Sequence, residues 1–85
     1  MSNHEVTLIG RAGCHLCDDA RVVITSVLSD MIDSPGTRDF TEVSIDDDAD
    51  LRAMYWEQIP VVLIDGRVHN FWHIDAERLT SALQG

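Results

Sequence analysis

Two cysteines, Cys14 and Cys17, stand between an apolar run and a long amphipathic segment, and they are the only cysteines in the chain. Residues 4–9 are β-prone and predict a strand. Residues 17–31 repeat apolar side chains at three- and four-residue spacings, which predicts a helix. Because positions i and i+3 share one face of a helix, the two sulfur atoms are expected to meet. The sequence therefore predicts a dithiol at a strand-to-helix junction.

The position of each cysteine predicts its role in thiol chemistry. A helix N-terminus carries partial positive charge and free N–H groups, which favour a thiolate, although Asp18 and Asp19 oppose it. Cys14, at the helix start, is the expected nucleophile, and Cys17, one turn further, is expected to be more buried. The rival interpretation is a zinc site completed by His69 and His73, but these lie much further along the chain than zinc-finger spacing allows.

The rest of the chain adds strands and helices in a defined order. Residues 40–45 alternate as a strand, residues 50–56 form a helix, and the apolar residues 61–64 are typical of a buried strand. Asp65-Gly66 predicts a hairpin turn into a strand at 67–71, and Asp75 can cap a last helix. The order βαβαββα predicts an α/β fold with a four-stranded mixed sheet flanked by helices, forming one domain over residues 1–85.

Charge and hydropathy exclude several classes of partner. The net charge is −9 and all six basic residues are arginine, which argues against nucleic acid and against anionic membranes. The first residues lack the basic and apolar regions of a signal peptide. No apolar stretch approaches the about 20 residues that a membrane span needs. A cytoplasmic protein is therefore expected, in a compartment where two cysteines are more often catalytic or metal-binding than structural.

Several segments together resemble the thioredoxin superfamily, and at this length its glutaredoxin-like branch of small bacterial proteins. They are Gly-Cys-His-Leu-Cys at residues 13–17, Ile59-Pro60-Val61-Val62, the Asp-Gly hairpin and the C-terminal helix. The resemblance implies that Cys14 attacks a disulfide and Cys17 resolves the product. It also implies a cis peptide bond at Pro60, with the backbone of Ile59 beside the active site and pairing with an extended substrate.

Three positions differ from the usual glutaredoxin pattern. The family's Cys-Pro-Tyr-Cys is replaced here by a pair enclosing His15-Leu16. The family's Gly-Gly-Asp motif, which holds glutathione, is absent, and Phe71-Trp72-His73 stands in its place. The usual basic residue before the first cysteine is Arg11 rather than lysine. The reductant is therefore left open between glutathione, another low-molecular-weight thiol and a thioredoxin-reductase-type donor.

The residues around the cysteines carry two interpretations each. His15 either stabilises the thiolate when protonated or faces solvent. Arg11 either complements the thiolate or a substrate carboxylate, or is a solvated loop charge. Trp72 either lines a groove beside the site or packs at the end of a strand. Three further aromatic residues are expected to pack in or at the edge of the core: Tyr55, Trp56 and Phe71.

The predicted function is that of a monomeric thiol–disulfide oxidoreductase with no bound prosthetic group. Its substrate would be a disulfide-bearing protein or the mixed disulfide of a small thiol. Three alternatives remain open. They are a non-enzymatic redox sensor or binding module, an iron–sulfur carrier in which Cys14 of two chains and glutathione hold a cluster, and a zinc-binding domain.

Overall fold

The first half of the chain forms a parallel β–α–β unit. In the computed structural model, which describes residues 2–84, strand β1 (Ser2–Gly10) leads through helix α1 (His15–Asp30) to strand β2 (Gly36–Ser44). The two strands pair in parallel along their whole length. This pairing explains why both strands are longer than predicted, so that Gly36 belongs to a strand rather than to the loop expected there.

The second half adds helix α2 (Ala49–Tyr55), the hairpin of strands β3 (Val61–Ile64) and β4 (Arg67–Phe71), and helix α3 (Ala76–Gln84). The strand order is β2-β1-β3-β4, and β3 runs antiparallel to both of its neighbours. The predicted α/β class, the order βαβαββα and the mixed four-stranded sheet are confirmed.

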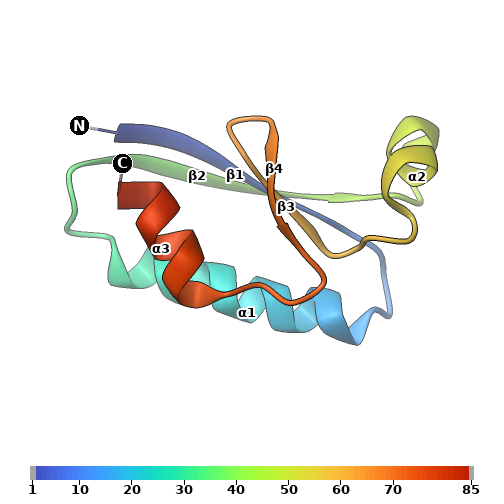
Figure 1. The fold of residues 1–85 in the computed structure, drawn as a ribbon, viewed down its shortest axis with the longest axis horizontal. Helices are drawn as coiled ribbons and strands as arrows, with labels where there is room; N and C mark the ends of the chain where they lie inside the picture. Colours follow the sequence, from blue (N-terminus) through green and yellow to red (C-terminus); the bar gives the residue numbers. More distant parts are fainter. Residues whose placement is uncertain (1, 85) are drawn as a thin grey trace.

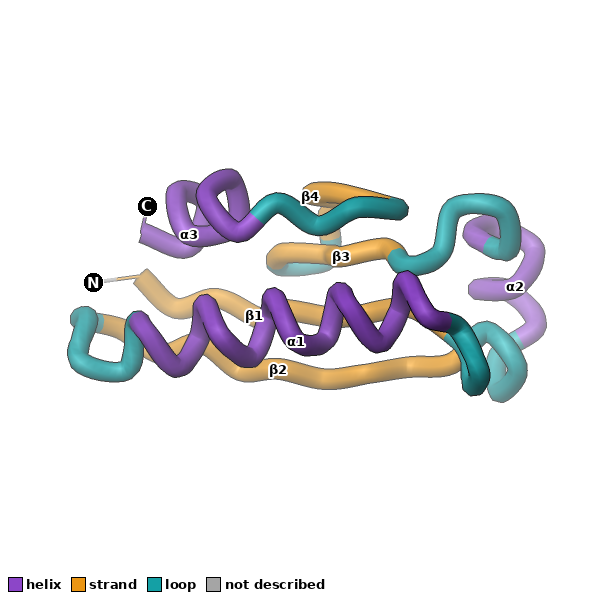
Figure 2. The backbone as a smooth tube through the Cα atoms, turned by 90° about the horizontal axis from the view of Figure 1, so that it is seen from below, coloured by secondary structure: helices purple, strands orange, loops and turns teal. Residues whose placement is uncertain are grey.

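The two faces of the sheet are covered unequally. Helices α1 and α3 lie on one face, and α2 lies beyond one end of the sheet (Figures 1 and 2). The larger apolar cluster lies between the sheet and the first two of these helices: Val6, Leu8, Ala20, Ile24, Val27, Met31, Val62, Leu79 and Leu83. A smaller cluster centres on Ile9, Ile45 and Val61, with Leu51 and Tyr55 of α2 packed against it.

The predicted hairpin turn forms as expected. Asp65 and Gly66 have φ angles of 54° and 82°, which is the left-handed pair that a tight hairpin turn requires. The Asp65 carboxylate accepts a hydrogen bond from the Glu5 N–H at 2.9 Å, and this bond, with His4 Nδ1 at 2.6 Å, lowers the pKa of Asp65. The hairpin is thereby joined to β1.

The packing prediction for Trp56 is wrong. Its side chain is 60% exposed, whereas Tyr55 is half-buried against the smaller cluster. Leu51 and Tyr55 are four residues apart and share the packed face of α2, so the next residue turns about 100° away from it. None of the helices in the described part of the chain is long and apolar enough to cross a membrane.

Candidate functional site

The two cysteines lie where β1 passes into α1. A short loop turns the chain through Gly13, whose φ of 75° places it in the left-handed region. Cys14 is the N-cap of α1, and its Sγ atom accepts a hydrogen bond from the backbone N–H of Cys17 at 3.2 Å. The thiol thus takes the place of the oxygen that usually caps a helix. An N–H donor and a helix N-terminus both stabilise negative charge on this sulfur.

The second cysteine is in a different environment. Cys17 is 2% exposed, whereas Cys14 is half-buried, as the sequence predicted. Burial raises the pKa of Cys17 from its ordinary 9.0 to about 11, and the adjacent Cys14 thiol acts in the same direction. Cys17 is therefore a neutral thiol at pH 7. Cys14 is accessible and accepts a hydrogen bond from a backbone N–H, whereas Cys17 is a buried and protonated thiol.

The end of β1 lies directly against Cys17. A Cβ atom built on Gly10 would lie 2.8 Å from Cys17 Sγ and 3.2 Å from Cys17 Cβ. Both distances are shorter than ordinary van der Waals contact. Only a residue without a side chain fits here while Cys17 keeps its position.

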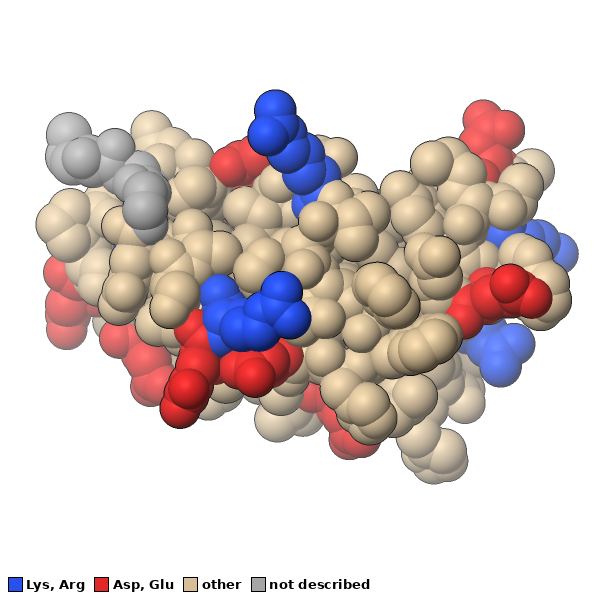
Figure 3. All heavy atoms as spheres, in the orientation of Figure 1, with Lys and Arg blue, Asp and Glu red and all other residues tan. Residues whose placement is uncertain are grey.

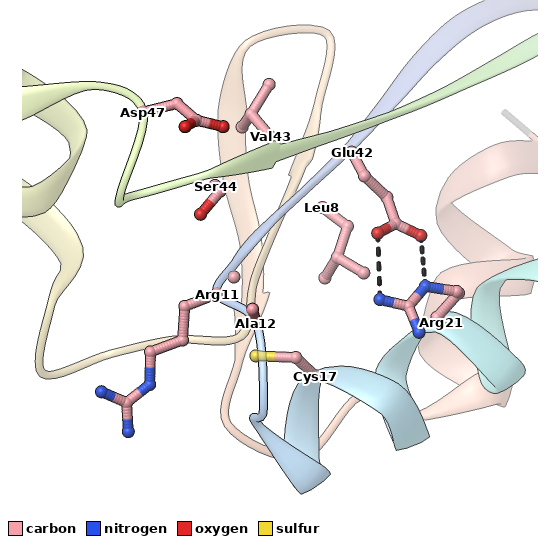
Figure 4. A pocket seen from close by; sticks show the side chains of 10 residues that line it. Leu8, Arg11, Ala12, Cys17, Arg21, Glu42, Val43, Ser44 and Asp47 are labelled. Carbon is pink, nitrogen blue, oxygen red and sulfur yellow. Dashed lines mark hydrogen bonds and ion pairs between the residues drawn. The ribbon is translucent and has the colours of Figure 1, made fainter.

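A cavity of about 310 Å³ opens on the β2 side of Cys17 (Figure 4). The Arg21 guanidinium lines it and binds both carboxylate oxygens of Glu42, with its Nη2 atom 3.0 Å from Glu42 Oε2. Its Nη1 atom lies 3.0 Å from Asp18 Oδ1. Arg21 therefore partly neutralises the acidic residue that follows Cys17 and that the sequence counted against a thiolate.

Arg11 stands between two cavities. It lines the cavity beside Cys17 and a second one of about 440 Å³, bounded by Ile45, Arg52 and Trp56 among others. In Figure 4 the Arg11 side chain extends away from Cys17. The Arg11 guanidinium is therefore not directed at the Cys17 thiol. His15 is exposed in the first turn of α1.

A second group of predicted site residues forms around Pro60. The Ile59–Pro60 peptide bond is cis. The Trp72 backbone N–H donates to the Pro60 carbonyl at 2.9 Å, and its indole Nε1–H donates to the Glu57 carbonyl at 3.0 Å. The Phe71 and Trp72 rings meet edge to face with their centroids 5.1 Å apart. The segment after β4 is thus bound to the segment before β3.

Trp72 has an unusual backbone. Its φ is 65°, in the left-handed region that a bulky residue rarely adopts, and its side chain is 51% exposed. Phe71 packs on it at the end of β4, as expected, but remains 41% exposed. In Figures 1 and 2 the segments before β3 and after β4 lie beside the N-terminal turns of α1. Both groups of site residues therefore lie at the same end of the molecule.

The comparison with protein families covers nearly the whole chain. Residues 5–84 match the family model described as Glutaredoxin-like domain (DUF836). The chain belongs to this glutaredoxin-like family. The expected thioredoxin-superfamily resemblance is thereby confirmed.

Relatives of this glutaredoxin-like protein agree with the assignment. The uncharacterized protein Rv0508 of Mycobacterium tuberculosis is 34% identical over 79 residues, which cover 93% of this chain and 81% of that protein. The X-ray structure of protein XcR50 from X. campestris has a TM-score of 0.63 at 35% identity, covering 92% of this chain and 93% of that one. Protein Ne2328 from Nitrosomonas europaea shares the fold, with a TM-score of 0.69 at 21% identity over 98% and 94% of the two chains.

Two features of the site were not predicted from the sequence. One is Gly10, whose only signal was a glycine at the end of an apolar run. The other is the ion pair of Arg21 with Glu42, which joins α1 to β2 across 21 residues of chain. Within residues 2–84, no three His, Cys, Asp or Glu side chains are grouped so that they could hold a metal ion.

Proposed function

We propose that this glutaredoxin-like protein is a cytoplasmic thiol–disulfide oxidoreductase that reduces disulfides of polypeptides through Cys14 and Cys17. One observation carries the proposal. The Cys14 Sγ atom accepts a hydrogen bond from the Cys17 backbone N–H at 3.2 Å, yet Cys14 is half-buried at a helix N-terminus and the Cys17 side chain is buried. This division suits a nucleophile that meets the substrate and a resolving thiol protected from it.

The reaction balances without a bound cofactor. The Cys14 thiolate attacks one sulfur of the substrate disulfide and expels the other as a thiolate, leaving a mixed disulfide on Cys14. Cys17 then loses its proton to solvent and attacks Cys14 Sγ, which expels the second substrate thiolate. The substrate gains two electrons, and Cys14 and Cys17 become a disulfide that an external dithiol or two small thiols must reduce.

The surface around the cysteines supports a polypeptide substrate. Leu16, Phe71 and Trp72 are 38%, 41% and 51% exposed. Figure 3 shows an uncharged region over this side of the molecule, between the charged groups near α3 and those near α2. Such a surface is suited to the apolar side chains that flank a disulfide in an unfolded or extended chain. The nearby Pro60 backbone and the Arg11 guanidinium would position that chain.

The test is reduction of a protein disulfide by the purified chain with two alternative donors. One assay supplies glutathione with its reductase, and the other supplies thioredoxin reductase with NADPH. We expect turnover with at least one donor, loss of activity in Cys14→Ser, and accumulation of a mixed disulfide in Cys17→Ser. Unchanged activity in Cys14→Ser would contradict the proposal, and a folded wild-type protein that works with neither donor would favour the redox-sensor alternative.

A further inference from the structure

Gly10 is the residue of β1 that meets the buried thiol. The strand holds it in place from the other side, because the Gly10 carbonyl accepts a hydrogen bond from the Ile45 N–H at 2.9 Å and Gly10 pairs with Ser44 of β2. The strand cannot move away from α1 without breaking this pairing. Any atom added at position 10 must therefore displace Cys17.

The backbone at position 10 does not itself require glycine. Positive φ angles occur at Gly13, Gly36 and Gly66, and Gly10 is not among these glycines. An alanine here would adopt the strand conformation without strain and would lower the entropy of the unfolded chain. The obstacle to a side chain is the Cys17 side chain alone, at 2.8 Å from Sγ and 3.2 Å from Cβ.

We propose that Gly10 is a positioning residue for the resolving step, because the absence of a side chain leaves the space in which Cys17 Sγ stays within reach of Cys14. The inference rests on the proposed function and assigns a role to a residue that contacts no substrate. In the resolving step the Cys17 sulfur forms a bond to Cys14 Sγ, the bond from Cys14 to the substrate sulfur breaks, and the Cys17 proton passes to solvent. A methyl group at position 10 pushes the attacking sulfur off this line.

The cavity beside Cys17 allows a methyl group at position 10 to displace the Cys17 side chain without disturbing the rest of the fold. It contacts both Gly10 and Cys17 and has a volume of about 310 Å³, so a displaced Cys17 side chain has space to enter. Gly10→Ala is therefore expected to fold with a shifted thiol. A displacement of about 1 Å at a reacting atom can cost a reaction about a hundredfold in rate.

The experiment measures the attack by Cys14 and the attack by Cys17 separately, with 5,5′-dithiobis(2-nitrobenzoate) as the disulfide substrate. Attack by Cys14 releases the first coloured thiolate, and attack by Cys17 on the mixed disulfide releases the second, so stopped-flow absorbance records two phases. We expect Gly10→Ala to leave the first phase within about twofold of wild type and to slow the second at least about tenfold. An unchanged second phase in folded Gly10→Ala would overturn the inference.

Gly66→Ala serves as the matched control. It places a methyl group at a glycine with a φ of 82° and no atom within 4 Å of the new Cβ, so it strains the hairpin without touching Cys17. It should destabilise the fold and leave both phases unchanged. A slowed second phase in Gly66→Ala would show that general destabilisation explains the effect, and would overturn the inference.

A double-mutant cycle tests the contact itself and needs no disulfide substrate. Gly10→Ala should lower the urea midpoint in the wild-type background and should lower it less in Cys17→Ala, where the sulfur at 2.8 Å is gone and only the Cβ atom at 3.2 Å remains. Equal losses in both backgrounds would contradict the inference. The cycle remains informative if the Gly10→Ala protein does not fold. Folding of the double variant Gly10→Ala, Cys17→Ala would then support the contact, and a double variant that also fails to fold would contradict it. Since the cycle does not depend on oxidoreductase activity, it separates failure of this inference from failure of the proposed function.

Discussion

The Cys17 backbone N–H donates to the Sγ atom of Cys14 at 3.2 Å, while the Cys17 side chain is buried beneath it. The backbone and the side chain of Cys17 therefore relate to the Cys14 sulfur in two different ways. The backbone N–H donates a hydrogen bond to that sulfur, and in the proposed mechanism the Cys17 thiol, one helical turn away, later attacks the same atom.

The two cysteines should differ in alkylation. Burial raises the pKa of Cys17 to about 11, so at pH 7 this thiol is both protonated and inaccessible. We expect iodoacetamide to modify Cys14 in the folded protein at pH 7 and to leave Cys17 free, as read by mass spectrometry of the peptides. The unfolded protein, with both thiols exposed, is the control and should lose the difference. Equal modification of the two in the folded state would contradict the assignment.

The raised pKa of Cys17 also links stability to pH. Between its ordinary value of 9.0 and about 11, the unfolded chain releases the Cys17 proton while the folded chain retains it. The native state then binds more protons, so the stability of the reduced protein falls as pH rises through this range. We expect urea midpoints to decrease from pH 9 to 11 in wild type, and to decrease less in Cys17→Ser. The same decrease in both proteins would show that Cys17 is not the group responsible.

Arg21 should influence reactions with charged disulfides. It neutralises part of the charge of Asp18 and Glu42 beside the cysteine pair in a chain of net charge −9. Arg21→Gln should slow the reaction of Cys14 with an anionic disulfide by about two- to fivefold at low salt, and less as salt is added. Arg67→Gln in the hairpin makes the same change in net charge and is the control. Equal slowing in both would assign the effect to net charge alone.

The sequence predicted the order of elements because each carries its own local signal. The helical spacing in α1, the four apolar residues of β3 and the Asp65-Gly66 turn depend only on residues close together in the chain. Strand length and the covering of each face depend on partners instead. Only the parallel pairing with β1 extends β2 back to Gly36.

The same distinction applies to the site. Spacing along the chain placed Cys14 and Cys17, and the family resemblance added Pro60. The closeness of Gly10 to Cys17, and the left-handed φ of Trp72, arise from how separate segments pack. Neither follows from a pattern of residue types, so only the folded structure shows them.

The packing of α1 gives a direct test of the fold. Ile24 is 0% exposed in the larger cluster, and Ile32, just beyond the helix, is 81% exposed. Ile24→Ala should cost about 2–5 kcal/mol of unfolding free energy through lost burial and a residual cavity. The same substitution at Ile32 should change the unfolding free energy by less than about 0.5 kcal/mol. Chemical denaturation of the two variants measures both values, and similar losses would contradict the packing of α1 on the sheet.

Trp72 should affect polypeptide substrates more than small ones. Its indole is 51% exposed and is hydrogen-bonded to Glu57 in the segment before the cis proline, so it offers a fixed apolar surface near the cysteines. Trp72→Ala should raise KM for a protein disulfide about five- to tenfold, since an exposed aromatic anchor at an interface contributes about 1 kcal/mol or more. Reaction of Cys14 with a small disulfide should change by less than about twofold, because a small molecule does not reach this surface. Trp56→Ala is the control, since Trp56 is 60% exposed at the C-cap of α2 and its backbone N–H donates to the Arg52 carbonyl within that helix. If both variants raise KM equally, or if Trp72→Ala slows the small disulfide as much as the protein, Trp72 is not a substrate-binding residue.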